Sequence, residues 1–253
     1  MSGPFILDHD AISARLFYPW PDPFLDPFYV KGAAGRLGCW YGNFFPEGMT
    51  MFRFHGNGET VREYRDDFSG QVADLKINLL LAEYRGYGMA EGRPLLADML
   101  KDFPAIVEAT GVSADRVIFF GRALGSLYAV HAAALYPRAA GLVVESGIAD
   151  PLELIMERVR PKQMNISPEA LRNAVERVFD QRGNLAGFSG RTVIMHTRND
   201  ELISVSHGES LYALAGGAKR LVVFERGYHN NIREVNENAY WGHLREVVRE
   251  CSG

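Results

Sequence analysis

The chain has 253 residues, of which 47% are hydrophobic and 23% are charged, and this composition excludes the disordered and fibrous classes. Its 27 basic side chains are dispersed and outnumbered by 31 acidic ones, so binding to nucleic acid or to an anionic membrane surface is not expected. Because α/β folds often use roughly 200 to 250 residues as one domain, we expect a single domain over residues 1–253.

The termini and the cysteines give a first indication of the compartment. The first ten residues lack the apolar run of a secretory signal, and no segment has the ~18 to 20 apolar residues of a membrane span. Cys39 and Cys251 lie near opposite ends of the chain, which is typical of free thiols rather than of a disulfide framework. We therefore expect a cytoplasmic protein.

Short aliphatic segments alternate with helical patterns along the chain. After an extended lead-in at 18–23 and a strand at 36–41, the sequence predicts strands at 49–54, 77–82 and 116–120, followed in turn by helices at 61–75, 95–109 and 124–136. Later strands are predicted at 141–145, 191–196 and 220–224, with a helix starting near residue 204 and a closing helix at 237–250. This alternation predicts an α/β fold with a mostly parallel sheet flanked by helices on both faces.

An insertion at 149–190 interrupts the alternation and carries two amphipathic helix patterns. The first starts at Asp150-Pro151, an N-cap followed by an N1 proline, and the second starts at Ser167-Pro168. We expect a small helical lid, in which Ile155, Met156 and Val159 are candidates to line a substrate pocket. The alternative is that both helices only pack against the sheet.

Polar and glycine-rich motifs follow the predicted strands, where the reactive groups of a parallel α/β sheet gather. They are His55-Gly56-Asn57-Gly58, Tyr84-Arg85-Gly86-Tyr87-Gly88, Gly121-Arg122-Ala123-Leu124-Gly125, Asp200, and Gly227-Tyr228-His229-Asn230. In these motifs and their order the chain resembles the α/β-hydrolase superfamily, in particular its esterase and acyl-thioesterase-like branch, from about residue 37 to residue 229. The spacing also fits, since Asp200 follows position 123 by 77 residues and His229 follows after another 29.

The resemblance implies a catalytic site with one departure from the family. Ala123 stands where the family has its serine nucleophile, while Asp200 and His229 match the acid and the general base. Backbone N–H groups of Asn57 and Leu124 would form the oxyanion hole. Because a methyl group cannot attack a carbonyl, this chain is expected to lack acyl-transfer activity.

Several nearby residues have plainer interpretations. Ser126 is the only hydroxyl near position 123, but it lies inside the helix that follows the turn and would not be presented to the other catalytic groups. Glu201 and Glu145 are alternatives to Asp200 as the acid. His55 is expected to orient its own loop. Arg85 could bind an anionic substrate, although anchoring of its turn is the favoured interpretation.

No metal or other cofactor is expected, because the sequence has no metal-ligand spacing and no phosphate-binding loop. The first functional hypothesis is a serine hydrolase of small acyl esters or thioesters, inactivated by a serine-to-alanine replacement at Ala123. The second is a natural non-catalytic pseudo-hydrolase that binds a small acyl or aromatic ligand. A third is a cofactor-independent lyase or oxygenase in which His229 is the base. The oligomeric state is left open.

Overall fold

A computed structural model describes residues 3–253 and contains one eight-stranded sheet. The strand order is β1-β2-β4-β3-β5-β6-β7-β8. The strands are β1 (Phe28–Gly32), β2 (Gly35–Gly42), β3 (Thr50–Phe54), β4 (Asn78–Ala82), β5 (Val117–Arg122), β6 (Gly141–Glu145), β7 (Arg191–Thr197) and β8 (Lys219–Phe224). From β4 to β8 all neighbouring strands are parallel, while β1 and β2 add an antiparallel edge. The predicted mostly parallel sheet is confirmed.

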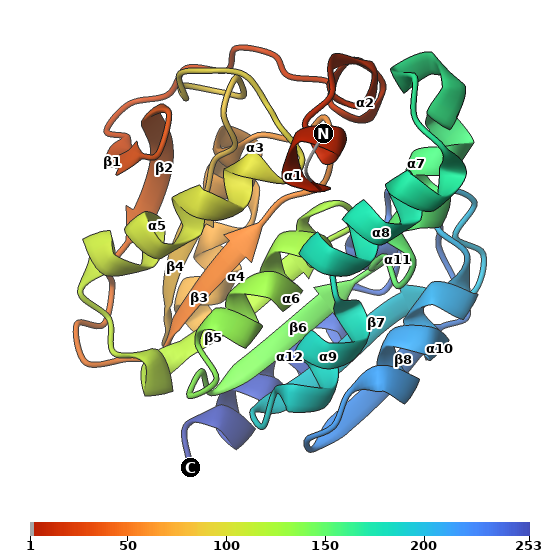
Figure 1. Ribbon diagram of the computed structural model, residues 1–253. Coiled ribbons are helices and arrows are strands. Elements are labelled where there is room, and N and C mark those ends of the chain that lie inside the picture. Colours follow the sequence, from red (N-terminus) through yellow and green to blue (C-terminus); the bar gives the residue numbers. More distant parts are fainter. Residues whose placement is uncertain (1–2) are drawn as a thin grey trace.

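Helices cover both faces of the sheet (Figure 1). One face carries α5 (Phe103–Thr110), α6 (Gly125–Leu135), α8 (Pro168–Val178), α9 (Gln181–Gly187) and α10 (Val205–Leu214). The other carries α3 (Val61–Asp67), α4 (Ser69–Asp74), α11 (Ile232–Val235) and α12 (Glu237–Cys251). The central strands supply both hydrophobic cores alternately, since Val117 and Phe119 face the first core and Ile118 and Phe120 face the second. Burial on both faces explains why these strands are continuously apolar.

Two predicted helices differ from the observed ones. The helix predicted at 61–75 is divided at Phe68, where the hydroxyl of Ser69 donates to the carbonyl of Arg65 and competes with the backbone ladder. The helix predicted at 95–109 instead begins with a 3-10 turn, η1 (Asp98–Asp102), before α5. Pro104 stands in the first turn of α5, the position in a helix that a proline tolerates best.

The 149–190 segment contains α7 (Pro151–Arg158), the 3-10 turn η3 (Pro161–Met164), α8 and α9. The Asp150 side chain accepts hydrogen bonds from the N–H groups of Leu152 and Glu153, as its N-cap pattern predicts. Two short N-terminal helices that the sequence analysis did not predict, α1 (Gly3–Leu7) and α2 (Asp10–Leu16), contact α8 and α7 (Figure 1). The N-terminus therefore covers part of this segment.

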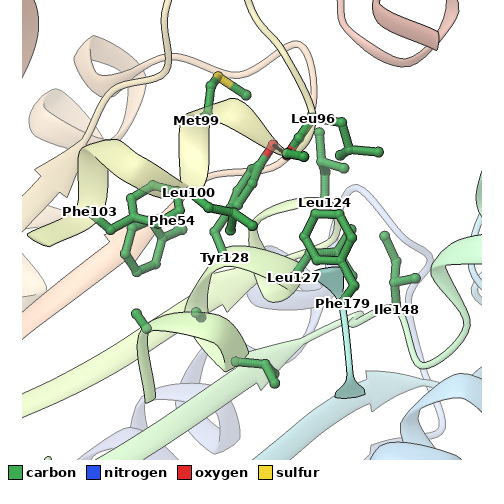
Figure 2. Close-up of a cluster of buried hydrophobic side chains, with 14 of the residues drawn as sticks. Phe54, Leu96, Met99, Leu100, Phe103, Leu124, Leu127, Tyr128, Ile148 and Phe179 are labelled. Carbon is green, nitrogen blue, oxygen red and sulfur yellow. Dashed lines mark hydrogen bonds between the residues drawn. The ribbon is translucent and has the colours of Figure 1, made fainter. Parts of the chain in front are cut away.

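A hydrophobic cluster surrounds the first turns of α6 (Figure 2). Leu124, Leu127 and Tyr128 contribute to it from the start of this helix, and all three are buried. The rings of Tyr128 and Phe103 are 5.0 Å apart, and those of Phe103 and Phe54 are 4.9 Å apart. This packing fixes the position of the turn that precedes α6.

No helix within residues 3–253 is long and apolar enough to cross a membrane.

Candidate active site

A sharp turn joins β5 to α6, and Ala123 lies at its centre. The residue has a φ of +48°, a left-handed conformation that costs a non-glycine residue about 1 to 2 kcal/mol. Its N–H donates to the carbonyl of Glu145 over 2.9 Å, which ties the turn to β6. A Cβ atom at Gly125 would lie 2.2 Å from the carbonyl oxygen of Phe54, so the close approach of the turn to β3 requires glycine there.

The turn opens into a cavity of about 330 Å³, near the lower end of the usual range for ligand pockets. The residues around it come from the N-terminal segment, the loops after β3, β5, β6, β7 and β8, and helix α7. They are Leu16, Tyr18, Asn57, Arg122, Ala123, Leu124, Ile148, Leu154, Arg158, Leu202, Ile203, His229 and Asn230. The wall combines aliphatic side chains with polar ones, among them Arg122, Arg158 and His229.

His229 and Asp200 form a buried pair beside this cavity. The Nδ1 atom of His229 lies 2.8 Å from one Asp200 carboxylate oxygen and 3.0 Å from the other. Within residues 3–253 its Nε2 atom has no hydrogen-bond partner, so it is the ring nitrogen that remains able to exchange a proton. The neighbouring Glu201 lies near the backbone N–H of His229, at 3.4 Å, rather than near its ring.

Asp200 is held by several donors. Its Oδ1 atom accepts hydrogen bonds from the N–H groups of Leu202 and Ile203, and the Nε2 atom of His196 lies 3.3 Å from its Oδ2 atom. Burial by itself would raise the pKa of Asp200, but the contacts with His196 and His229 outweigh burial and the pKa is lowered. The carboxylate therefore stays charged beside the imidazole.

Asn57 and Leu124 both line the cavity, and their backbone N–H groups are the predicted oxyanion-hole donors. Neither has a hydrogen-bond acceptor within residues 3–253, so both can donate to a bound oxygen. The Asn57 side chain is already used, because its amide donates to the Leu16 carbonyl at 2.6 Å and its oxygen accepts from Tyr18 and Tyr87. These bonds fix the loop and attach the N-terminal segment to it.

The alternative residues have structural contacts. The Ser126 hydroxyl is fully buried and donates to the carbonyl of Ala123 at 2.6 Å. The Glu145 carboxylate accepts from Arg122 at 2.9 Å and from the Tyr240 hydroxyl at 2.5 Å. None of these contacts brings Ser126 or Glu145 to the imidazole of His229.

His55 and Arg85 are buried and lie outside the cavity lining. His55 contacts Glu83 at 2.8 Å; burial opposes the charge of the imidazole, but Glu83 outweighs it and the pKa of His55 is raised. Arg85 donates to both oxygens of Asp102, at 2.7 and 3.0 Å. Arg85 therefore anchors its turn, and its guanidinium is not available to a substrate in this cavity.

The prediction that Ile155, Met156 and Val159 line the pocket is wrong for this cavity. Ile155 and Val159 are buried in the hydrophobic core, and the Met156 side chain is 45% exposed. Leu154 and Arg158, four residues apart on α7, face the cavity instead. The apolar stripe of an amphipathic helix identifies the face that packs on the protein, and here the pocket lies beside that stripe.

Sequence reasoning does not assign several other lining residues to the pocket. Tyr18 reaches the cavity from the segment predicted as an extended lead-in, and Leu16 from the end of α2, a helix that the sequence pattern does not predict. Arg122 belongs to a predicted motif but has no predicted role, although its place at the end of a strand is a signal that could have identified it. Within residues 3–253, no cluster of three or more His, Cys, Asp or Glu side chains could hold a metal ion.

Comparison with known proteins agrees with this architecture. No family model matches the chain. It is 24% identical to mouse alpha/beta hydrolase domain-containing protein 17C over 214 residues, which are 82% of this chain and 63% of that protein. The chain therefore matches less than two thirds of that relative's length.

Two solved structures show the same fold. Est1E from Butyrivibrio proteoclasticus, bound to ferulic acid, has a TM-score of 0.70 and 15% identity, covering 88% of this chain and 96% of its own. A serine-to-alanine mutant of the meta-cleavage product hydrolase CumD from Pseudomonas fluorescens, complexed with acetates, has a TM-score of 0.65 and 15% identity, covering 88% and 97%. The chain has the α/β-hydrolase fold.

Proposed function

We propose that this protein, with a serine at position 123, is a hydrolase of carboxylic esters or thioesters that acts through an acyl-enzyme. One observation carries the proposal. Ala123, His229, Asn57 and Leu124 line the same cavity, the backbone N–H groups of Asn57 and Leu124 have no acceptor within residues 3–253, and Asp200 pairs with the imidazole of His229. This set lacks only a nucleophile.

The proposed reaction begins with the serine hydroxyl. Its oxygen attacks the substrate carbonyl while its proton moves to Nε2 of His229, and Asp200 stabilises the resulting imidazolium. The N–H groups of Asn57 and Leu124 donate to the oxyanion of the tetrahedral intermediate. The intermediate breaks down when His229 returns the proton to the leaving alcohol or thiol. A water molecule then attacks the acyl-enzyme by the same steps and releases the acid.

Ala123 is best interpreted as a replacement that removes this nucleophile and leaves the rest of the site in place. The left-handed conformation at Ala123 costs energy, and an alanine gains nothing from it that a glycine would not supply. The CumD mutant shows that a related fold with the same kind of replacement can be complexed with acetates. We therefore propose that the Ala123 form binds substrate and product acids without turning substrates over.

The test is to make the Ala123→Ser variant and treat both forms with a fluorophosphonate probe and a panel of acyl esters and thioesters. We expect the variant to be labelled at position 123 and to hydrolyse part of the panel, and the Ala123 form to do neither. Adding His229→Ala to the variant should abolish labelling. A folded Ala123→Ser variant that is not labelled would refute the proposal.

The second candidate function is ligand binding without catalysis. The observation that favours it is that the cavity, with both aliphatic and polar lining residues, is present although position 123 has no hydroxyl. In that case both forms bind small acyl or aromatic acids with similar affinity in calorimetry, and the Ala123→Ser variant hydrolyses nothing. Hydrolysis by the Ala123→Ser variant therefore distinguishes the two functions, whereas ligand binding does not.

A further inference from the structure

We propose that Arg122 is a positioning residue. Its guanidinium binds both the loop after β3 and the loop after β8, and so fixes the position of Asn57 relative to His229 in the candidate site. The inference rests on the proposed function in one respect only, namely that the loops after β3 and after β8 carry catalytic groups. We name residues 55–60 the oxyanion loop and residues 226–232 the histidine loop.

The Arg122 side chain leaves β5 one residue before Ala123 and is almost completely buried. Its guanidinium donates to four residues from three places in the chain. Nε donates to Glu145 at 2.9 Å, one terminal nitrogen donates to Glu59, and the other donates to the carbonyl of His229 at 2.9 Å and to the side chain of Asn230 at 3.2 Å. All three guanidinium nitrogens are therefore engaged.

Through Glu59 this guanidinium reaches the oxyanion loop. The second oxygen of Glu59 accepts from the N–H of Gly56 at 2.5 Å and from the Tyr64 hydroxyl at 2.8 Å. A Cβ atom at Gly56 would lie 2.7 Å from the guanidinium of Arg122, so a larger residue there would displace the guanidinium from its partners. Burial opposes ionisation of Glu59, but the charge of Arg122 outweighs it and lowers the pKa of Glu59. The N–H of Asn57, the next residue, is thereby held at the cavity.

Through the carbonyl of His229 the same guanidinium fixes the backbone of the histidine loop. Asp200 restrains the ring of His229 from one side, and Arg122 restrains its main chain from another. A displacement of about 1 Å at such a group can lower a rate by ~100-fold. The position of the general base thus depends on Arg122 as well as on Asp200.

Only arginine fits this role. Its planar guanidinium presents five N–H donors in fixed directions, whereas a lysine ammonium is a compact charge on a flexible chain. A lysine at position 122 would keep the positive charge between Glu59 and Glu145 but could not also reach the carbonyl of His229. Arg122→Lys therefore tests the loss of the hydrogen bonds to the histidine loop while the positive charge is kept.

The first experiment needs no catalysis. Amide hydrogen exchange is measured on the chain with Ala123, on its Arg122→Gln variant and on an Arg220→Gln control, because Arg220 also pairs with two carboxylates, Glu246 and Glu250, far from the cavity. In Arg122→Gln we expect exchange to increase by about tenfold in both the oxyanion loop and the histidine loop. The control should leave both loops unchanged.

The second experiment uses the Ala123→Ser background. Arg122→Lys and Arg122→Gln should lower kcat by ~10- to 100-fold while KM changes by less than about twofold, because the loss is in the placement of the reacting groups. Glu59→Gln should also lower kcat. The double variant Glu59→Gln with Arg122→Gln should lose little more than Arg122→Gln alone, since Glu59 links Arg122 to the oxyanion loop and Arg122→Gln already breaks that link.

The outcomes are distinguishable. Unchanged exchange in both loops of a folded Arg122→Gln variant overturns the inference, whatever the activity. If exchange in both loops of Arg122→Gln is faster but no probe labels the Ala123→Ser variant, the positioning role of Arg122 is supported and the proposed function is refuted. If the Arg122 variants do not fold, Glu59→Gln is made in the chain with Ala123. The inference predicts faster amide exchange in the oxyanion loop of this variant, and unchanged exchange there contradicts it.

Discussion

The imidazole of His229 and the carboxylate of Asp200 are 2.8 Å apart, although 29 positions separate the two residues in the chain. Asp200 follows β7 and His229 follows β8, and these strands are parallel neighbours at one edge of the sheet. Their carboxyl ends therefore bring the two loops together. The sheet, and not the local sequence, creates this pair.

This pair predicts how stability depends on pH. Burial disfavours the Asp200 charge, but its contacts with His196 and His229 dominate and lower the pKa of Asp200 in the folded chain. The folded state then binds fewer protons than the unfolded one, so this stabilisation is present above the unfolded pKa of about 3.9 and decreases as the pH falls from about 5 to below that value.

Urea unfolding between pH 5 and pH 2.5 checks this expectation. Asp200→Asn should be less stable than the parent at pH 5, and the difference should shrink as the pH falls. Asp10→Asn is the control, because the Asp10 side chain is 76% exposed. A constant difference between Asp200→Asn and the parent over this range would contradict the assignment.

The backbone strain at Ala123 predicts that a glycine at this position stabilises the folded chain. Because the φ of Ala123 is +48°, Ala123→Gly should raise the free energy of unfolding by about 1 kcal/mol. Ala134→Gly in the last turn of α6 should lower it, since glycine is a poor helix former. Thermal and urea unfolding measure both. Equal destabilisation by the two glycines would show that the turn is not strained.

The position of the cavity predicts which α7 residues affect substrate choice. In the Ala123→Ser background, Leu154→Trp should reduce kcat/KM for long acyl chains more than for acetyl esters, because Leu154 lines the cavity. Met156→Trp is the matched control, since Met156 lies two residues away and points to solvent. A change in chain-length preference caused by Met156→Trp alone would place the acyl group elsewhere.

The cysteines predict low thiol reactivity in the folded chain. Burial raises the pKa of Cys39 to about 12 and that of Cys251 to about 11, so both thiols are protonated at pH 8. Iodoacetamide at pH 8 should alkylate Cys39 only after unfolding in guanidinium chloride, and the half-buried Cys251 only slowly before it. Mass spectrometry reads out both sites. Rapid alkylation of Cys39 in the folded protein would contradict this burial.

Much of the fold could be predicted because its signals are local. The strand predicted at 141–145 coincides with β6, and the closing helix predicted at 237–250 matches α12 within one residue. Period and apolar content are properties of short segments, so they survive without tertiary information. The helix predicted at 61–75 is too long, since the structure divides it at Phe68, where the Ser69 hydroxyl donates to the carbonyl of Arg65.

The sequence by itself determined the fold class, the order of the motifs and the presence of an alanine at position 123 of the third motif, because each of these is written in consecutive residues. Only the tertiary structure decided that Leu154 rather than Ile155 faces the cavity, that Leu16 and Tyr18 close one side of it, and that Arg122 joins two loops. These facts depend on the directions of side chains from segments distant in sequence, and such directions are set by packing rather than by local pattern.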